Sequence, residues 1–256
     1  MKGPCAAKIL PDFLASPLFG DRKRFGLIPD KKDPDWAEWQ RIYLDFYYAN
    51  QKRSVGAFVN NAGYRVLKGL DLEGKRVLEI GPGHIQHLPY WRGRPAHFEI
   101  ADVDGRMLEA SSSVLEREGV NFGRKLLVPR DPVLPYADAS FDLVLSFYSL
   151  EHLFPLGDYL GEMIRVLKPG GFLAGAIPAE GGLAWGLGRF LTSRRWFKKN
   201  SSVNPDKIIC WEHPNFAPDI LEALDARLRR KAVSTWPWGL PLVDFNLIIR
   251  FVHEKR

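Results

Sequence analysis

The segment 76–104 contains two short apolar runs, each ending in residues suited to ligand binding. Residues 77–80 are followed by a Gly-Pro-Gly turn at 81–83, and residues 98–101 are followed by Asp102. Short apolar runs bounded by charged residues and glycines are typical of fully buried parallel strands. The sequence therefore predicts two parallel strands whose carboxyl ends carry a glycine turn and an acid.

The turn and the acid have the spacing of a nucleotide site. Gly81 and Gly83 have no Cβ, so a ligand can approach the backbone closely. Asp102 follows Gly81 by about 20 residues, the spacing at which a second-strand acid reaches a ribose in a βαβ unit. Gln86 stands where the dinucleotide fingerprint needs a third glycine, and Glu79 adds negative charge beside the turn. These features favour a cationic, nucleoside-containing ligand over a pyrophosphate.

Both strands resemble the first two motifs of class I S-adenosylmethionine-dependent methyltransferases. The matching stretches are Val-Leu-Glu-Ile-Gly-Pro-Gly at 77–83 and Ala-Asp-Val-Asp-Gly-Arg-Met-Leu at 101–108. Arg-Val-Leu-Lys-Pro-Gly-Gly-Phe-Leu at 165–173 resembles the family's approach to its fifth strand. Leu-Glu-His at 150–152 is common in the methyltransferase type 11 group, which the chain resembles over about residues 74–178.

The resemblance implies an α/β fold, a Rossmann-like three-layer sandwich. Its seven-stranded, mostly parallel sheet would have an antiparallel last strand inserted between the fifth and sixth. We expect an N-terminal arm and helical lid at 1–70, with 1–34 irregular, and a methyltransferase domain at 71–256 with an inserted helical cap at about 179–215. Periodicity and turn residues predict one helix that starts near 33–35 and another that follows the glycine turn. Further helices are predicted at 54–69, 106–118, 156–167 and 218–230. Strands are predicted at 125–128, 143–147, 172–177, 232–238 and 242–252.

By the same resemblance the cofactor would be S-adenosylmethionine. Asp131 would accept a hydrogen bond from the adenine amino group. The spacing is one residue shorter than in the family, so Arg130 is an alternative aligned position, and a plain turn before Pro132 stays open. The full set of expected cofactor-binding residues is Glu79, Gly81, Pro82, Gly83, Asp102, Val103, Asp131 and Ser146.

His152 follows the predicted fourth strand, at the edge where open α/β sheets bind ligands. A neutral imidazole can take a proton from an oxygen acceptor near pH 7, so we expect His152 to be the catalytic base. The alternatives are packing against the cofactor's methionine end and capping the next helix. The residues expected to bind the acceptor are Tyr43, Tyr47, Tyr148 and His213.

Two further segments have more than one interpretation. Aromatic residues at helical spacing over 36–47 fit either a lid over the active site or a helix docked on the core. The segment 183–199 combines apolar residues with Arg and Lys. It fits a substrate-binding cap, a helix in a membrane interface, or a surface helix with no special role.

Composition excludes several classes of protein. The two cysteines give no disulfide framework, and no metal-binding His or Cys spacing occurs, so no metal is expected. No apolar run is long enough to span a membrane, and no signal peptide is recognised, so a cytoplasmic location is expected. The net charge of +6 comes without an RNA-binding signature, so no nucleic-acid partner is expected. The oligomeric state is not specified.

These observations predict methyl transfer from S-adenosylmethionine to a small-molecule acceptor. A sugar, a glycan or a lipid-linked precursor would fit, and O- or C-methylation stays open. One alternative is a non-catalytic binding module of the same fold, which would explain Ile85 in place of the family's third glycine. The other is an NAD-dependent enzyme, which needs the glycine missing at Gln86.

Overall fold

The structure of the protein is a computed structural model that describes residues 5–50 and 54–256. The chain divides into two compact units, each assembled from separate stretches of sequence. Unit 1 consists of Met1–Ala62, Pro178–Leu221 and Thr235–Ile249. Unit 2 consists of Gly63–Ile177, Glu222–Ser234 and Arg250–Arg256.

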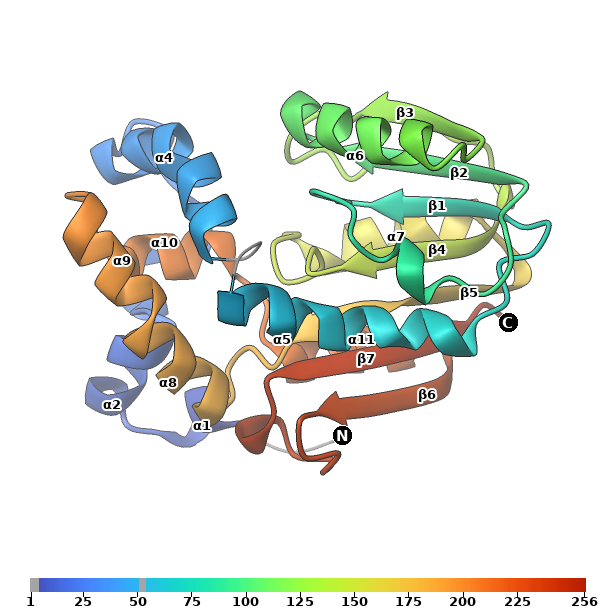
Figure 1. Cartoon of the computed structure of the whole chain (residues 1–256). Helices are drawn as coiled ribbons and strands as arrows, with labels where there is room; N and C mark the ends of the chain where they lie inside the picture. Colours follow the sequence, from blue (N-terminus) through green and yellow to red (C-terminus); the bar gives the residue numbers. More distant parts are fainter. Residues whose placement is uncertain (1–4, 51–53) are drawn as a thin grey trace. The chain divides into compact units, whose positions relative to one another are not determined.

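A seven-stranded sheet forms the framework of unit 2, with the strand order β3-β2-β1-β4-β5-β7-β6 (Figure 1). The first five strands are parallel neighbours. The expected fold class and the insertion of β7 between β5 and β6 are therefore confirmed. The strands are β1 (Arg76–Ile80), β2 (His97–Asp102), β3 (Phe122–Leu126), β4 (Phe141–Phe147), β5 (Leu167–Pro178), β6 (Arg229–Trp236) and β7 (Ile248–Glu254).

The backbone hydrogen bonds around β7 show that this strand runs against its neighbours. Lys255, just after β7, exchanges bonds with Gly170 and Gly171 at the start of β5. Leu247, just before β7, accepts from Ala179 after β5 and donates to Trp236 at the end of β6. The end of β7 therefore lies beside the start of β5, as an antiparallel pair requires.

The central parallel strands β1 and β4 are buried on both faces, which explains their largely apolar sequences. In β1, Val77 and Leu78 are fully buried, and in β4 the same is true of Val144 and Leu145. β1 and β2 are in register at Ile80 and Ala101. Their carboxyl ends, and with them the glycine turn and Asp102, therefore lie at the same edge of the sheet.

Three helices are associated with this sheet. α6 (Gly105–Arg117) packs along β2 and β3, and α7 (Leu156–Val166) connects β4 to β5. α11 (Ala217–Arg227) leads into β6. The Asp104 side chain caps α6 by accepting from the Arg106 amide, an interaction that favours a helix start at this point.

The structure differs from expectation after the glycine turn and at the N-terminal arm. The helix expected after the glycine turn is absent, and residues 84–96 contain only the short 3₁₀ helix η2 (Leu88–Tyr90). Pro89, Gly93 and Pro95 explain this, because prolines and glycines interrupt a helix. The irregular arm expected at 1–34 contains three short helices, α1 (Ala6–Ile9), α2 (Asp12–Phe19) and α3 (Arg22–Phe25).

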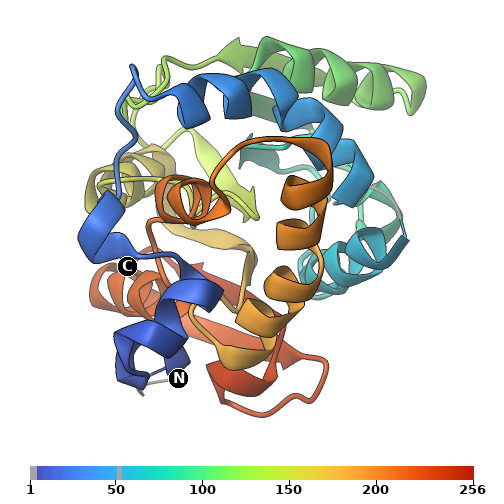
Figure 2. The same cartoon turned by 90° about the vertical axis from the view of Figure 1, so that its left-hand side faces the viewer.

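Unit 1 is built from helices, and Figure 2 shows the blue α4 and the orange α8 to α10 face on. Its core includes a buried cluster that joins the N-terminal helices to the predicted insert: Trp39, Ile42, Phe197, Val203, Ile208, Cys210 and Trp211. The insert holds three helices where one was expected. The bounds are α4 (Pro34–Asn50), α5 (Ser54–Tyr64, continuing as the 3₁₀ helix η1, Arg65–Gly69, in unit 2), α8 (Leu183–Leu191), α9 (Ser193–Asn200), α10 (Pro205–Glu212) and the 3₁₀ helix η3 (Val243–Phe245).

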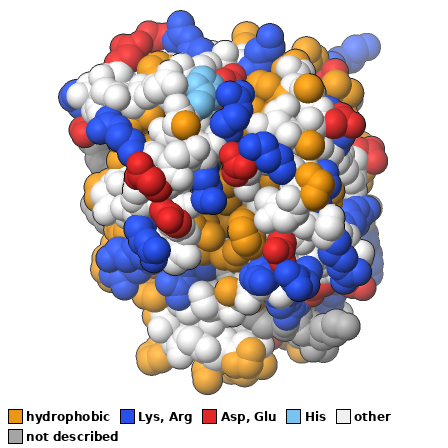
Figure 3. Space-filling model, turned by 90° about the vertical axis from the view of Figure 1, so that its right-hand side faces the viewer, with side chains coloured by type: hydrophobic (Ala, Val, Ile, Leu, Met, Phe, Trp, Pro, Cys, Tyr) orange, Lys and Arg blue, Asp and Glu red, His pale blue; other side chains and the backbone are white. Residues whose placement is uncertain are grey.

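The excess of positive charge does not form a uniform field on the face seen in Figure 3. Lys and Arg side chains lie there among Asp and Glu side chains, with hydrophobic side chains between them. Interspersed charges of both signs are typical of an ordinary solvated surface.

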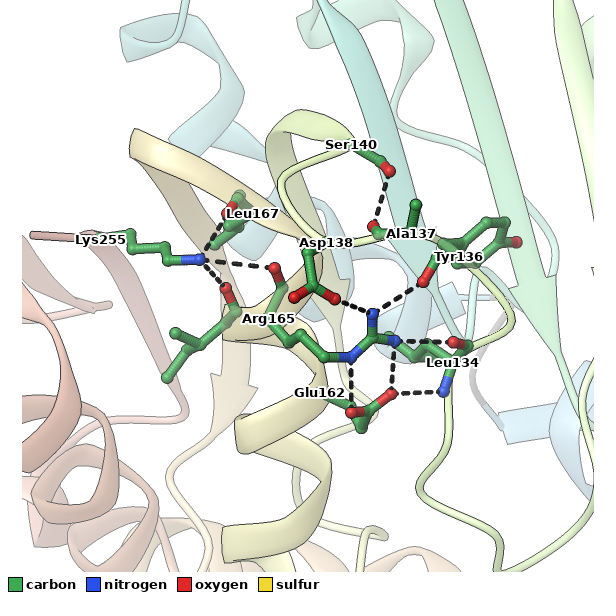
Figure 4. A network of polar contacts seen from close by, with 10 residues as sticks. Leu134, Tyr136, Ala137, Asp138, Ser140, Glu162, Arg165, Leu167 and Lys255 are labelled. Atoms are coloured by element: carbon green, nitrogen blue, oxygen red, sulfur yellow. Dashed lines mark hydrogen bonds and ion pairs between the residues drawn. The ribbon is translucent and has the colours of Figure 1, made fainter.

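Arg165, near the end of α7, ties down the loop that precedes β4 (Figure 4). Its guanidinium donates to the backbone oxygens of Leu134 and Tyr136, at 2.8 Å each. It also pairs with Asp138 at 2.7 Å and with Glu162 at 2.7 Å. Because the planar guanidinium serves four partners at once, one side chain fixes the course of the loop.

We expect Arg165→Ala to lower the free energy of unfolding by about 2 kcal/mol, because two carbonyls and two carboxylates lose a charged donor. Chemical denaturation measures the change. Arg124→Ala is the matched control, since Arg124 makes an exposed ion pair with Glu109 that is worth less than about 1 kcal/mol. Equal effects of the two substitutions would contradict the anchoring role of Arg165.

Candidate active site

The structure places the glycine turn against the acid that ends β2. Gly81 and Gly83 have φ values of 66° and 55°, a region that non-glycine residues avoid. The Gly81 amide donates to the Ala101 oxygen at 2.8 Å. The Gly83 amide donates to the Asp102 carboxylate. The turn and the acid therefore form one continuous structure at the carboxyl edge of the sheet.

Two serines at the end of β4 support the turn from one side. A Cβ at Gly81 would lie 2.8 Å from the Ser149 Cβ, so only glycine allows this close approach. The Ser149 hydroxyl donates to the Ile80 oxygen at 3.1 Å and contacts the Ser146 hydroxyl at 2.5 Å. Ser146, predicted to contact the cofactor, is fully buried and acts on the turn through Ser149.

Ser111 supports the turn from helix α6. Its hydroxyl donates to the Gly83 oxygen at 2.5 Å and accepts from the Ile85 amide at 3.3 Å. Sequence reasoning missed this residue. The available signal was a serine on the apolar face of α6, where a polar side chain has to find a partner.

Burial raises the pKa of Asp102 to about 6, although the amides of Asp104 and Gly83 donate to its carboxylate and oppose the shift. A carboxylate in this setting suits the hydroxyl groups of a ribose, which donate to it without adding charge. The neighbouring Val103 is half exposed, at 51%. Pro82 is buried within the turn.

Glu79 is fully buried and belongs to a chain of three polar side chains. Its Oε2 atom lies 2.9 Å from His87 Nε2, and the Trp91 indole donates to His87 Nδ1 at 2.9 Å. An indole nitrogen can only donate, so Nδ1 accepts and Nε2 carries the proton. His87 is therefore a neutral imidazole that donates to Glu79. The rings of Tyr64, Phe98 and Phe147 surround it.

The second carboxylate oxygen of Glu79, Oε1, has no hydrogen-bond partner among the described residues. A buried carboxylate oxygen without a donor is unfavourable. A ligand that carries positive charge would satisfy it. Glu79 Oε1, two residues before the turn, therefore suits the positive charge of S-adenosylmethionine better than the negative charge of a pyrophosphate. His87 and Trp91 were not expected to have a role.

His152 lies in the turn after β4, beside a buried acid that the sequence analysis did not single out. His152 Nε2 is 3.9 Å from Glu151 Oε1. The Glu151 side chain is 2% exposed and that of His152 is 35% exposed. A histidine that is partly open to solvent and backed by a buried carboxylate can accept a proton, because the carboxylate stabilises the resulting imidazolium.

Tyr148 adopts a φ of 57° and contacts the end of α5. The Gly63 amide donates to its hydroxyl oxygen, and a Cβ at Gly63 would lie 2.1 Å from that oxygen. Burial raises the pKa of Tyr148 well above its ordinary value, so the phenol stays neutral at physiological pH. Its contact with an acceptor stays a prediction.

The Asp131 side chain makes a local turn. Its Oδ1 atom accepts from the Val133 amide at 3.0 Å, and the residue is exposed. The preceding Arg130 has a φ of 65°. The turn interpretation of Asp131 thus has a direct structural basis, and its contact with adenine stays a prediction.

Three of the expected acceptor-binding residues belong to unit 1. Tyr43 and Tyr47 lie in its aromatic cluster, with ring centroids 6.0 Å apart. His213 Nδ1 is 2.8 Å from Glu180 Oε2. Their roles toward an acceptor stay predictions, and the same holds for the roles of α4 as a lid and of the insert as a cap.

Glu180 is a fully buried acid at the centre of a polar cluster in unit 1. Its carboxylate accepts from the Trp185 indole at 2.9 Å and from the guanidinium of the largely buried Arg189. Burial opposes ionisation, but Arg189 and His213 outweigh it and hold the pKa of Glu180 well below its ordinary value. The cluster fixes the orientation of His213.

Two features are absent from the residues that the structure describes. No helix in residues 5–50 and 54–256 is long and apolar enough to cross a membrane. Within the same residues, no group of three or more His, Cys, Asp or Glu side chains is placed to hold a metal ion.

Comparison with known proteins identifies a methyltransferase domain within the chain. Residues 78–175 match the family model described as "Methyltransferase domain". A fatty-acid O-methyltransferase of Mycolicibacterium smegmatis is 38% identical over 113 residues, which is 40% of this chain and 36% of that protein. A phthiotriol/phenolphthiotriol dimycocerosates methyltransferase of Mycobacterium ulcerans is 32% identical over 116 residues, 44% of this chain and 41% of that protein. The matches thus span about two fifths of these relatives.

A solved structure shows the same fold. The S-adenosylmethionine-dependent methyltransferase from Aquifex aeolicus superposes with a TM-score of 0.53 at 17% identity, covering 83% of this chain and 98% of the other. The fold and the matched domain define the class. Residues 78–175 form a methyltransferase domain of the class I, S-adenosylmethionine-dependent type, as predicted. The comparisons also support S-adenosylmethionine as the cofactor.

We expect the affinity for S-adenosylmethionine to fall below about pH 6. The pKa of Asp102 is raised to about 6 in the folded protein. Above that pH the carboxylate accepts from hydroxyl donors, and below it protonation removes this acceptor, with a limiting loss of about tenfold per pH unit. Calorimetry between pH 5 and pH 8 measures the trend. Asp102→Asn should bind more weakly and without this pH dependence; a wild-type affinity that is constant over the range would contradict the assignment.

We expect Glu180→Gln to destabilise the protein by about 3–5 kcal/mol, because Arg189 would be left buried without its counter-charge. Thermal unfolding followed by circular dichroism gives the change. Glu222→Gln, at an exposed position of α11, is the matched control and should have little effect. A Glu180 variant as stable as this control would show that the buried pair contributes nothing.

Proposed function

We propose that this protein transfers a methyl group from S-adenosylmethionine to an oxygen atom of a lipid-type small molecule. The observation that carries the proposal is the contact between the glycine turn and Asp102, with His152 and Glu151 at the neighbouring end of β4. Both curated relatives named above are lipid methyltransferases by name, which supports a lipid-type acceptor. No observation favours a sugar or a glycan.

The residues of unit 2 suit the binding of this cofactor. Asp102 would hold the ribose hydroxyls, the backbone of 81–83 would lie along the nucleoside, and Glu79 Oε1 would face positive charge. The bound cofactor supplies a methyl group that is already activated by the sulfonium. The protein then has to align the acceptor oxygen and exclude water.

His152 would remove the proton when the acceptor is a hydroxyl. Its imidazole is 35% exposed, so an acceptor can reach it, and Glu151 would stabilise the imidazolium that forms. A carboxylate acceptor needs no base, because it is nucleophilic when ionised. The importance of His152 therefore depends on the chemistry of the acceptor.

The two alternative functions, a non-catalytic binding module and an NAD-dependent enzyme, predict other outcomes. A non-catalytic binding module would bind the cofactor without turnover on any acceptor. An NAD-dependent enzyme would need a helix N-terminus behind the turn for the pyrophosphate, and residues 84–96 provide only the 3₁₀ helix η2. The buried Glu79 beside the turn would also repel a pyrophosphate.

The proposal is tested by incubating the protein with S-adenosylmethionine labelled at the methyl group and a panel of acceptors. The panel contains a long-chain fatty acid, a long-chain alcohol, a phenolic lipid and a free sugar. We expect label in at least one lipid and none in the sugar. Cofactor binding without transfer to any lipid would favour the binding module, and transfer to the sugar alone would contradict the acceptor class.

With a hydroxyl acceptor, we expect His152→Ala to lower kcat by about 10²–10⁴-fold, the usual contribution of a general base. With a fatty-acid acceptor the loss should stay below about tenfold. His97→Ala is the matched control, because His97 starts β2 at the opposite edge of the sheet. A loss below tenfold on a hydroxyl acceptor, at unchanged cofactor affinity, would remove His152 as the base.

A further inference from the structure

Helix α8 of unit 1 exposes a stripe of large apolar side chains. Leu183, Leu187, Phe190 and Leu191 are 37%, 45%, 43% and 51% exposed. Their spacing of four, three and one residues places them on one face of the helix. Amphipathic helices of globular proteins bury such a face, whereas α8 leaves it open.

A second exposed apolar segment adjoins α8. Residues 238–245 carry Trp238 at 70%, Leu240 at 49%, Leu242 at 50% and Phe245 at 54% exposure. The two segments are fixed to each other, because the Leu183 amide donates to Asp244 at 3.1 Å. Gly182 approaches Val243 so closely that an added Cβ would lie 2.6 Å from the Val243 oxygen. The two segments therefore form one surface, larger than scattered apolar residues would make.

Positive charge borders this surface. α9 follows α8 directly and exposes Arg195, Lys198 and Lys199. The segment 183–199 contains no Asp or Glu. The other two arginines of the segment are occupied within unit 1, because Arg189 pairs with Glu180 and Arg194 with Asp206. The charged side chains that this segment exposes are therefore all cationic.

We propose that α8, residues 238–245 and the basic face of α9 form a surface that docks on an anionic lipid membrane. Apolar side chains of a short helix can enter the boundary between headgroups and acyl chains, while neighbouring Lys and Arg contact anionic headgroups. A tryptophan such as Trp238 suits the interface between lipid and water. A second copy of the chain fits less well, since it would bring a second set of cations to the same surface. The proposal does not depend on the methyl-transfer reaction.

Vesicle co-sedimentation tests the proposal with the full-length protein. Vesicles of phosphatidylcholine alone are compared with vesicles containing about one third phosphatidylglycerol, at low and high salt. The wild type should bind the anionic vesicles, release with salt, and show a blue shift of tryptophan fluorescence on binding that is smaller in Trp238→Phe. No binding to the anionic vesicles overturns the proposal.

Variants locate the surface. Leu187→Glu/Phe190→Glu should weaken vesicle binding at least tenfold, and Lys198→Glu/Lys199→Glu should reduce the preference for anionic vesicles by a similar factor. Leu126→Glu, at a residue of unit 2 that is 60% exposed, is the matched control and should bind like the wild type. Circular dichroism checks the fold, and Leu240→Glu/Leu242→Glu replaces the helix variant if that variant does not fold.

Two further outcomes would overturn the proposal. One is a helix variant that folds and binds anionic vesicles as well as the wild type. The other is a wild-type dimer in analytical ultracentrifugation that Leu187→Glu/Phe190→Glu converts to a monomer, because a second copy would then cover this surface. Neither measurement uses enzymatic activity, so the methyl-transfer proposal can fail or hold independently.

Discussion

The contact between the backbone of residues 81–83 and the carboxylate of Asp102 is the constraint on which the rest of unit 2 depends. Parallel pairing of β1 and β2 brings the two together, because Ile80 and Ala101 are in register at the ends of these strands. Ser149 and Ser111 then hold the turn from two other elements. Both turn residues with positive φ are glycines, so the turn takes this shape without backbone strain.

The negative charge at the carboxyl edge of the sheet follows from the position of the glycine turn beside two acids. Glu79 and Asp102 place two acids around the turn, and burial raises the pKa of Asp102. His87 binds one oxygen of Glu79 as a neutral donor, so it leaves the negative charge of the acid in place. A site with this charge would suit a cation, which is why we propose that it favours a sulfonium cofactor over a dinucleotide.

Much of the fold was predictable, because parallel strands that are buried on both faces leave a clear apolar signal. The turn and Asp102 were predicted from local patterns, and the position of β7 was predicted from the family resemblance. The absence of a helix after β1 was not predicted, although Pro89, Gly93 and Pro95 were visible, because a glycine turn at the end of a buried strand usually leads into a helix. His87, Trp91 and Glu151 could not be identified, since their partners come from side-chain contacts that no spacing rule encodes. Ser111 gave only the weak signal of a serine on an apolar helix face. The exposure of the apolar side chains of α8 was not predictable either, because it depends on tertiary packing.

The central claim is that the turn and the acid together bind one cationic nucleoside, and native mass spectrometry of the purified protein tests it most directly. The account predicts a bound species with the mass of S-adenosylmethionine or its demethylated product, identified after release under denaturing conditions. A bound nicotinamide dinucleotide would contradict the account. So would a protein that stays free of ligand when excess S-adenosylmethionine is added.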